Sequence, residues 1–191
     1  MAQNPARRTA LADAAIEVLA REGARGLTFR AVDGRAGVPT GTASNYFASR
    51  DHLLHQAARR IHERLTPDAA ILAELLRAPR DRALVTALMH DVFRRITADR
   101  AGYLAMLELR LEATRRPELR AQLTGTIRDD LEANIAYHLG EGFPGDRETV
   151  LVLYLAMTGL ILEHLTLPEV LGVDGLAALI ETVVERIVPA A

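Results

Sequence analysis

Residues 37–54 constrain the fold of this 191-residue chain more than any other stretch. They begin with a glycine turn that follows a short helical segment, 28–36, and they continue into a second short segment, 40–47. The apolar residues of the first segment recur on one helical face: Phe29, Val32 and Ala36. Two short helices joined by a glycine turn form a helix-turn-helix, so the stretch predicts a compact all-α module.

The second segment carries small and polar residues: Gly41, Thr42, Ala43 and Ser44. Such side chains let a helix backbone approach a DNA duplex closely, so this helix could lie in a major groove. A loop between two core helices would show the same residues. The pattern alone leaves these two interpretations open.

The flanking residues favour the DNA-reading interpretation. Apolar residues between Leu11 and Leu19 fall on one helical face, and Gly23 suits the left-handed position past a helix end. Ser49 is a good N-cap, and Asp51 in the first turn suits the helix dipole, so a long amphipathic helix is expected at 49–65. The sequence therefore predicts three helices and a long helix that leaves them.

The motifs in this region are Gly-Leu-Thr-Phe-Arg-Ala-Val at 26–32, Ala-Gly-Val-Pro at 36–39 and Gly-Thr-x-x-x-Tyr-Phe-x-Ser-Arg-Asp-x-Leu-Leu at 41–54. Together they resemble the DNA-binding domain of the tetracycline-repressor (TetR) family over roughly residues 6–65. Many members carry Ser-Lys where this chain has Pro39-Thr40, and an aromatic residue in place of Ser44. These departures remove a cation and a ring from the expected recognition surface.

This surface, together with the resemblance, implies a set of DNA contacts. We expect Thr28 and Arg50 to bind phosphates, with Asn45 and Tyr46 beside them. The residues expected to face base edges are Thr40, Gly41, Thr42 and Ser44, and Arg30 is expected to reach a guanine. Phosphate contacts would set affinity and its salt dependence, and base contacts would set sequence preference.

The charge distribution agrees with a DNA-binding N-terminal end. Residues 1–64 carry ten Arg and six acidic residues, a net charge of +4, whereas the rest of the chain carries −6. The chain has no Cys, which excludes disulfides and thiolate metal sites. We found no phosphate loop, His-Glu-x-x-His motif or nucleophile elbow, so we expect no enzyme activity, cofactor or metal.

Beyond residue 65 the sequence predicts further helices separated by breakers. They are expected at 67–77, 80–97, 100–115, 117–139, 146–166 and 174–188, with Pro67, Pro79 and Pro117 in first turns. We therefore expect a DNA-binding domain at 1–48 and a larger helical ligand-binding and dimerisation domain at 49–191. Helix 49–65 would link the two.

Helix 146–166 is apolar on nearly all sides, so a second subunit is expected to cover one face of it. The predicted homodimer interface comprises Leu123, Ile127, Leu131, Ile135, Leu155, Ala156, Gly159 and Leu162. The alternative is a core helix of a monomer. A membrane span is not expected, because Thr158-Gly159 and Glu163-His164 interrupt the apolar run.

A hydrophobic effector is expected between the helices at 80–97, 100–115 and 117–139. The candidate lining residues are Met89, Phe93, Tyr103, Met106, Leu107, Arg110 and His138. The same residues would fill a solid core if no cavity exists. Glu108, Arg110 and Glu112 are expected to form a surface ion-pair face. The alternative is that they line the pocket, where an inward-pointing Arg110 would favour an anionic group.

These observations predict a cytoplasmic, homodimeric regulator that binds palindromic double-stranded operator DNA and is released by a small hydrophobic effector. The resemblance implies that ligand tilts helix 49–65 and changes the separation of the two recognition helices. A repressor is the preferred interpretation. An activator with the same DNA module, a protein adaptor and a helical-bundle enzyme remain as alternatives.

Overall fold

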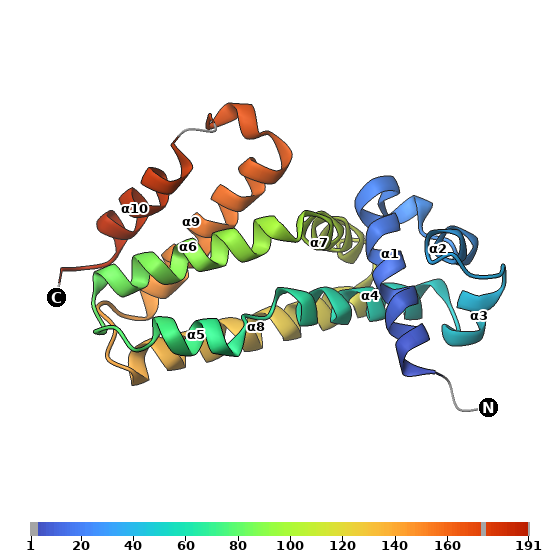
Figure 1. The fold of residues 1–191 in the computed structure, drawn as a ribbon, viewed down its shortest axis with the longest axis horizontal. Coiled ribbons are helices and arrows are strands. Elements are labelled where there is room, and N and C mark those ends of the chain that lie inside the picture. The colour runs from blue at the N-terminus through green and yellow to red at the C-terminus, as the bar shows by residue number, and fades with distance from the viewer. Residues whose placement is uncertain (1–3, 173–174, 191) are drawn as a thin grey trace. The chain divides into compact units, whose positions relative to one another are not determined.

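The computed structural model describes residues 4–172 and 175–190, and this part of the chain contains helices and no strand (Figure 1). The helices are α1 (Pro5–Gly26), α2 (Phe29–Arg35), α3 (Thr42–Tyr46), α4 (Arg50–Leu65), α5 (Ala69–Leu75), α6 (Arg82–Ala98), α7 (Arg100–Ala113), α8 (Pro117–Gly140), α9 (Arg147–Thr166) and α10 (Leu176–Ile187), with a 3₁₀ segment, η1 (Pro168–Val170), after α9. The predicted all-α fold class is confirmed.

The chain packs as two compact units. The N-terminal unit consists of Met1–Thr66 and Asp99–Ile127, and the C-terminal unit consists of Pro67–Ala98 and Arg128–Ala191. Helix α7 and the first part of α8 therefore pack with the DNA-binding helices. This grouping differs from the predicted boundary after residue 48, which assigned every residue from 49 onward to the other domain.

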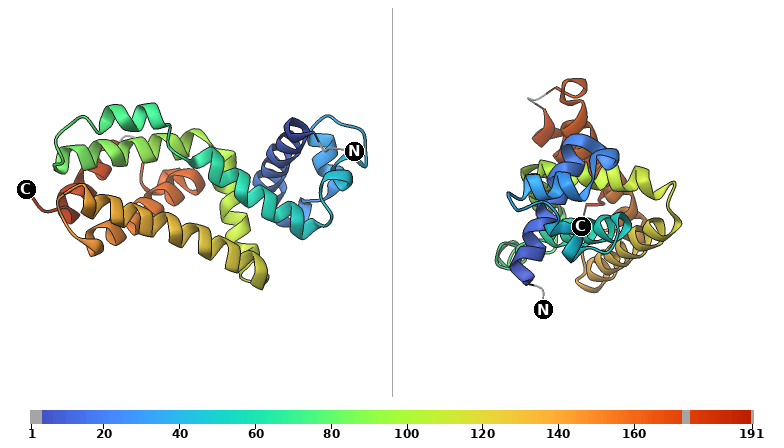
Figure 2. Two further views of the ribbon diagram at one scale, coloured as in Figure 1. Left: turned by 90° about the horizontal axis from the view of Figure 1, so that it is seen from below. Right: turned by 90° about the vertical axis from the view of Figure 1, so that its right-hand side faces the viewer.

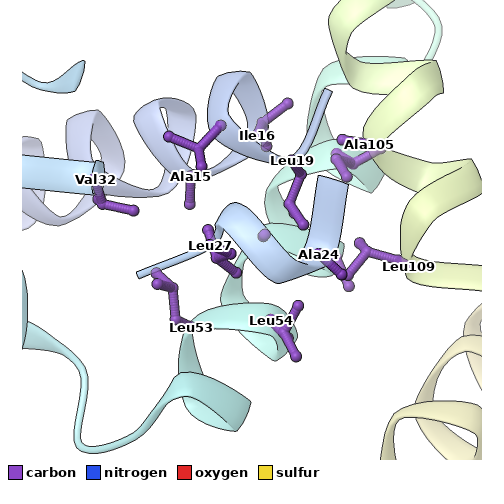
Figure 3. Packing of buried hydrophobic residues seen from close by; sticks show 14 of the residues in the cluster. Ala15, Ile16, Leu19, Ala24, Leu27, Val32, Leu53, Leu54, Ala105 and Leu109 are labelled. Atoms are coloured by element: carbon purple, nitrogen blue, oxygen red, sulfur yellow. The ribbon is translucent and has the colours of Figure 1, made fainter. Parts of the chain in front are cut away.

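The core of the N-terminal unit joins α1, α2, α4 and α7. Figure 3 shows Leu27, Leu53 and Leu54 converging beneath α1, with Leu109 of α7 beside Ala24. All four leucines are fully buried. Burial of each leucine contributes about 1.5–3 kcal/mol, so α7 is an integral part of the support for the DNA-binding helices.

Helix α1 bends at Gly23, which has a φ of 68° and a ψ of −178°. The left-handed φ predicted for this glycine is therefore present, but the helix resumes and ends at Gly26. The Ala24 N–H donates to Glu108 Oε2 at 3.1 Å. A carboxylate of α7 thus satisfies a backbone donor that the bend frees from the helix.

The starts of α2 and α4 are both capped by hydroxyl side chains, and of the two only the Ser49 cap was predicted. The Thr28 hydroxyl accepts from Ala31 N–H at 3.1 Å, and the Ser49 hydroxyl accepts from His52 N–H at 3.0 Å. Asp51 lies in the first turn of α4 and forms an ion pair with Arg116. These caps satisfy backbone donors that have no partner within their own helix.

The C-terminal unit packs α6 against α9 and α10, and α5 lies beside α6 (Figure 2). One cluster joins Leu84, Val85, Leu153, Val184 and Val188. Asp146 and Thr149 form a reciprocal capping box at the start of α9. The segment 149–153, which could pass for a strand in isolation, is helical.

Two proline predictions for this unit were wrong. Asp68 caps α5, so Pro67 precedes the helix, and α6 begins at Arg82, three residues after Pro79 and two residues after the predicted start at 80. Pro117 does begin α8, as predicted. A proline in a breaker segment marks where a helix cannot continue, but it does not fix where the next helix starts.

Candidate DNA interface

Helix α3 lies on the N-terminal unit through two buried anchors. Ala43 is fully buried and Phe47 is nearly so, and both belong to the same core cluster as Leu53 and Leu54. Thr40, Ser44 and Asn45 are exposed on the opposite side. The arrangement presents a polar helix face over an apolar base, which is the geometry that a groove-reading helix requires.

Helix α3 is shorter than predicted. It begins at Thr42, so Thr40 and Gly41 belong to the turn, and Gly41 has a φ of 93° as the N-cap residue. A residue with a side chain would be strained at this φ. The turn therefore requires glycine at position 41. The absence of a side chain on the DNA-facing surface at this position is a consequence of that requirement.

The two hydroxyls of α3 donate to the backbone. Thr42 Oγ1 donates to the Pro39 carbonyl at 2.6 Å, and Ser44 Oγ donates to the Gly41 carbonyl at 2.8 Å. A hydroxyl that has donated its hydrogen still offers acceptor lone pairs. In this conformation both side chains can accept from the amino groups of cytosine or adenine.

The other predicted contact residues surround α3. Thr28 and Arg30 are exposed near the start of α2, and Tyr46 is half-buried against the core. Because the Thr28 hydroxyl accepts from Ala31 N–H, its hydrogen stays available for a phosphate oxygen. Their DNA contacts stay predictions.

Arg50 has a structural role that the sequence did not indicate. Its Nε donates to the Leu27 carbonyl at 3.1 Å, and its Nη2 donates to the Ala24 carbonyl. These bonds fasten the start of α4 to the end of α1. The guanidinium has five N–H groups, so the remaining ones can still meet a phosphate.

We expect Arg50→Ala to weaken binding to operator and random DNA alike and to flatten the salt dependence by about one unit of slope. Loss of the two carbonyl contacts should also lower stability by about 1–3 kcal/mol. Anisotropy titrations at several salt concentrations and urea unfolding measure the two effects. Arg50→Lys is the control, because it keeps the positive charge but lacks the guanidinium that donates to two carbonyls. Unchanged DNA affinity in the Arg50→Ala variant would refute the phosphate assignment.

Sequence reasoning did not predict the contacts that three residues around α3 make: Arg8, Asp33 and His52. Arg8 lies over the Phe47 ring at 5.4 Å and contacts His52 Nε2 at 3.2 Å. Asp33, in α2, accepts hydrogen bonds from the start of α3. Each contact joins residues far apart in sequence or on different helices, so no local pattern could have indicated it.

Comparison with known proteins agrees with this geometry. Residues 11–57 match the family "Bacterial regulatory proteins, tetR family", and residues 80–190 match "Tetracyclin repressor-like, C-terminal domain". The second match alone covers more than half of the chain. The chain belongs to the TetR family of transcriptional regulators.

Three relatives of this TetR-family protein show the extent of the similarity. It is 30% identical over 179 residues to the HTH-type transcriptional regulator BetI of Agrobacterium fabrum (strain C58), covering 93% of this chain and 85% of that protein. A TetR family member from Streptomyces coelicolor A3 matches with a TM-score of 0.74 and 28% identity, over 97% of this chain and 100% of that one. The multidrug binding protein EbrR complexed with ethidium matches with a TM-score of 0.66 and 28% identity, over 96% and 99% of the two chains.

Helix α9 of this TetR-family protein exposes an apolar stripe in the C-terminal unit. Val152, Leu155 and Leu162 are exposed, Leu155 to 66%, and Gly159 lies on the same face with no atom within 4 Å of an added Cβ. Met157 and its neighbours on the other face are buried. Length and composition alone would also permit this helix to cross a membrane.

Part of the predicted dimer interface on α8 must be corrected. Leu123 and Ile135 are buried within the chain's own units, and Leu123 belongs to the N-terminal core. Ile127 and Leu131 are half-buried. Spacing of four residues identified an apolar face, but that face packs on the same chain, so Leu123 and Ile135 have little surface left for a partner.

The predicted effector residues on α7 lie in the N-terminal unit. Met106 packs against the core that includes α1 and α4, Tyr103 is buried, Leu107 is half-buried and Arg110 is exposed. The condition for an anionic preference, an inward-pointing Arg110, is therefore not met. Glu112 is buried against Arg115 and Arg116, whose hydrogen bonds hold the pKa of its carboxyl below the usual value. Glu112 therefore forms ion pairs, but not as part of the predicted surface face.

The other predicted effector residues lie in the C-terminal unit. Met89 and Phe93 of α6 pack against the cluster formed by Met157, Leu160, Leu176 and Ile180. His138, by contrast, contacts the Pro144 carbonyl through Nε2 at 3.1 Å and stacks on Phe143. His138 therefore fastens the turn after α8 and is engaged without a ligand.

His164 of α9 was not among the predicted effector residues. Its ring lies 5.0 Å from the Phe93 ring, and its Nδ1 is buried with no hydrogen-bond partner in the described part of the chain. A buried polar atom without a partner is uncommon and calls for a water or a ligand. His164 thus joins Met89 and Phe93 as a candidate effector contact.

A cavity of about 330 Å³ lies elsewhere, in the N-terminal unit. The cavity lies between the start of α4 and the turn that joins α7 to α8. Its lining residues are Asp51, Leu54, His55, Arg115, Arg116, Pro117, Glu118 and Leu119. None of the predicted effector residues lines it. Arg116 spans its edge by pairing with both Asp51 and Glu112.

Proposed function

We propose that this TetR-family regulator is a homodimeric repressor that reads a palindromic operator with α3 and is released by a small hydrophobic effector. The observation that carries the proposal is the exposed polar face of α3, held over the buried anchors Ala43 and Phe47. Thr28, Arg30, Asn45, Tyr46 and Arg50 would surround the base-reading residues Thr40, Gly41, Thr42 and Ser44. Such a protein acts on cytoplasmic DNA.

A second copy of the chain covers the exposed stripe of α9 in this proposal. Leu155 and Leu162 supply apolar area, and Ala156 and Gly159 permit close approach of the partner's helix. A two-fold axis places the same patch on both subunits. The membrane alternative is less consistent with a chain whose family regulates transcription.

In the proposed mechanism, the effector binds to the domain formed by residues 49–191, and movement of α4 releases the DNA-binding domain, residues 1–48, from the operator. Arg50 ties the start of α4 to α1, and Asp51 ties it to the turn that precedes α8. Two recognition helices fit successive major grooves only when they lie about 34–36 Å apart or at a multiple of that distance. An effector that prefers the misaligned state by about 1–3 kcal/mol changes affinity about 5- to 150-fold.

The proposed effector site lies in the C-terminal unit around Met89, Phe93 and His164. Methionine and phenylalanine offer an adaptable apolar wall, and His164 Nδ1 offers one polar contact to orient the ligand. The EbrR complex with ethidium, a flat aromatic cation, supports an aromatic class of effector. Arg110 is excluded from the proposed site.

We expect Phe93→Ala to lose effector-induced release while operator affinity stays within about two-fold, because the side chain contacts the proposed site and no part of the DNA interface. Arg110→Ala is the matched control and should release normally. Ethidium is the first probe, followed by compounds from a screen of apolar aromatics, and release is measured as loss of DNA anisotropy. Normal induction of Phe93→Ala by an active compound would remove this region from the effector site.

Selection of binding sites from random duplex DNA tests the proposed function as a whole. The expected product is an inverted repeat, with half-site centres about 10–10.5 base pairs apart or at a multiple of this spacing. Placing the selected site within a promoter then tests repression by transcription in vitro. A single, non-repeated site would contradict the dimer, and increased transcription would identify an activator.

A further inference from the structure

Asp33 is an acidic residue in the interior of the N-terminal unit. Its side chain belongs to α2, and only 1% of the residue is exposed. A carboxylate away from water is costly unless hydrogen bonds replace its hydration. The position therefore requires partners that compensate for the burial.

Both oxygens of Asp33 accept hydrogen bonds from the start of α3. Oδ2 accepts from Gly41 N–H at 2.7 Å, and Oδ1 accepts from Ala43 N–H at 2.6 Å. The intervening Thr42 N–H donates to the Pro39 carbonyl at 3.1 Å. All three consecutive backbone donors at this helix start are thus satisfied, two of them by one side chain of the preceding helix.

The N-cap residue of α3 makes no side-chain hydrogen bond. This residue is Gly41, which has no side chain, and Pro39 has neither a hydroxyl nor an N–H group. The helix has five residues, far fewer than an isolated helix needs for stability in water. A negative charge at its N-terminus also complements the partial positive charge of the backbone there.

We infer that Asp33 is a positioning residue for DNA recognition: it fixes the start of α3 on α2 and so sets which side chains face the bases. The inference rests on the proposed function, in which α3 is the reading helix. Ala43 and Phe47 hold one side of α3 on the core, and Asp33 holds its N-terminal end. Release of that end would let Thr42 and Ser44 move relative to the phosphate-binding residues Thr28 and Arg50, which lie outside α3.

The predicted consequence is a loss of sequence preference. Base contacts depend on the placement of α3, whereas the phosphate contacts that dominate binding to random DNA do not. We expect Asp33→Ala to lower affinity for the selected operator about ten-fold or more and affinity for random duplex DNA less than three-fold. The ratio of the two affinities is therefore the readout.

A second substitution provides a rescue. A serine at position 39 would lie two residues before Gly41, within the spacing of an ordinary N-cap, and would satisfy one of the two donors that Asp33→Ala leaves free. Asp33→Ala/Pro39→Ser should therefore recover at least three-fold of the lost operator preference. Asp33→Asn keeps the shape of the side chain and one acceptor oxygen. It replaces Asp33→Ala in the affinity measurements if the Ala variant does not fold.

Glu108→Ala is the matched control. Glu108 also accepts a backbone N–H in the same unit, from Ala24, but has no contact with α3. This variant should lose stability in urea unfolding and keep the wild-type ratio of operator to random affinity. Comparison with Asp33→Ala separates positioning of α3 from general destabilisation.

Anisotropy titrations of these variants with the selected operator and a random duplex decide the matter. A reduced ratio in the Asp33 variants, restored by Pro39→Ser and unchanged in Glu108→Ala, supports the inference. An unchanged ratio in folded Asp33→Ala and Asp33→Asn, or an equal reduction in Glu108→Ala, overturns it. If the wild-type protein itself shows a ratio of one, the proposed reading role of α3 fails, which is a distinct result.

Discussion

Gly159→Arg is expected to convert the homodimer into a monomer of 20.9 kDa and to weaken operator binding about 10²- to 10⁴-fold, because one subunit can occupy only one half-site. The arginine has open space around it within its own chain, so folding should be preserved. In the dimer the same side chain would place an unpaired charge against the partner's α9. Light scattering gives the mass, and anisotropy gives the affinity.

Gly175→Arg is the control for this substitution. Gly175 is also exposed in the C-terminal unit and has open space around it, but it precedes α10 and lies off the α9 stripe. The Gly175→Arg variant should stay dimeric. A Gly159→Arg protein that remains dimeric, or a wild-type protein that is monomeric, would show that α9 does not form the interface.

Leu109→Ala should destabilise the protein by about 2–5 kcal/mol, because it removes a fully buried side chain and leaves a cavity. The residue packs on Ala24 between α7 and the DNA-binding helices (Figure 3). Urea unfolding followed by circular dichroism measures the loss. We also expect weaker operator binding, since the support beneath α1 and α4 is lost.

Leu111→Ala is the matched control in the same helix. Leu111 is 56% exposed, so the same chemical change should alter stability by no more than about 0.5 kcal/mol. Equal effects of the two substitutions would contradict the assignment of α7 to the N-terminal core. A large effect confined to Leu109 would support it.

The sequence was sufficient for the elements of the fold but not for their packing. Helical periodicity located α1, α4, α8 and α9, and the Ser49 cap was visible because it lies three residues from its donor. The Glu108 contact with Ala24 joins residues 84 positions apart. No local pattern encodes such a pairing, so the attachment of α7 to the N-terminal unit was not predicted.

The same limit applies to the sites. The small residues of α3 were recognisable because composition and spacing are local properties. The apolar face of α8 was also recognisable, but periodicity does not tell whether a buried face meets the same chain or a partner, and Leu123 and Ile135 were assigned wrongly for that reason. Asp33 was overlooked because an acidic residue on a short helix ordinarily faces solvent.

Affinity cleavage from position 44 tests the central claim, that two copies of α3 read the operator, most directly. The chain has no Cys, so Ser44→Cys provides a unique attachment point for an iron–EDTA group on the exposed face of α3. The account predicts two clusters of cleavage on the selected operator, related by its dyad and about 10–10.5 base pairs apart or at a multiple of this spacing. Unlabelled Cys-free protein should produce none, and a single cluster, or no cleavage from a labelled variant that still binds, would contradict the account.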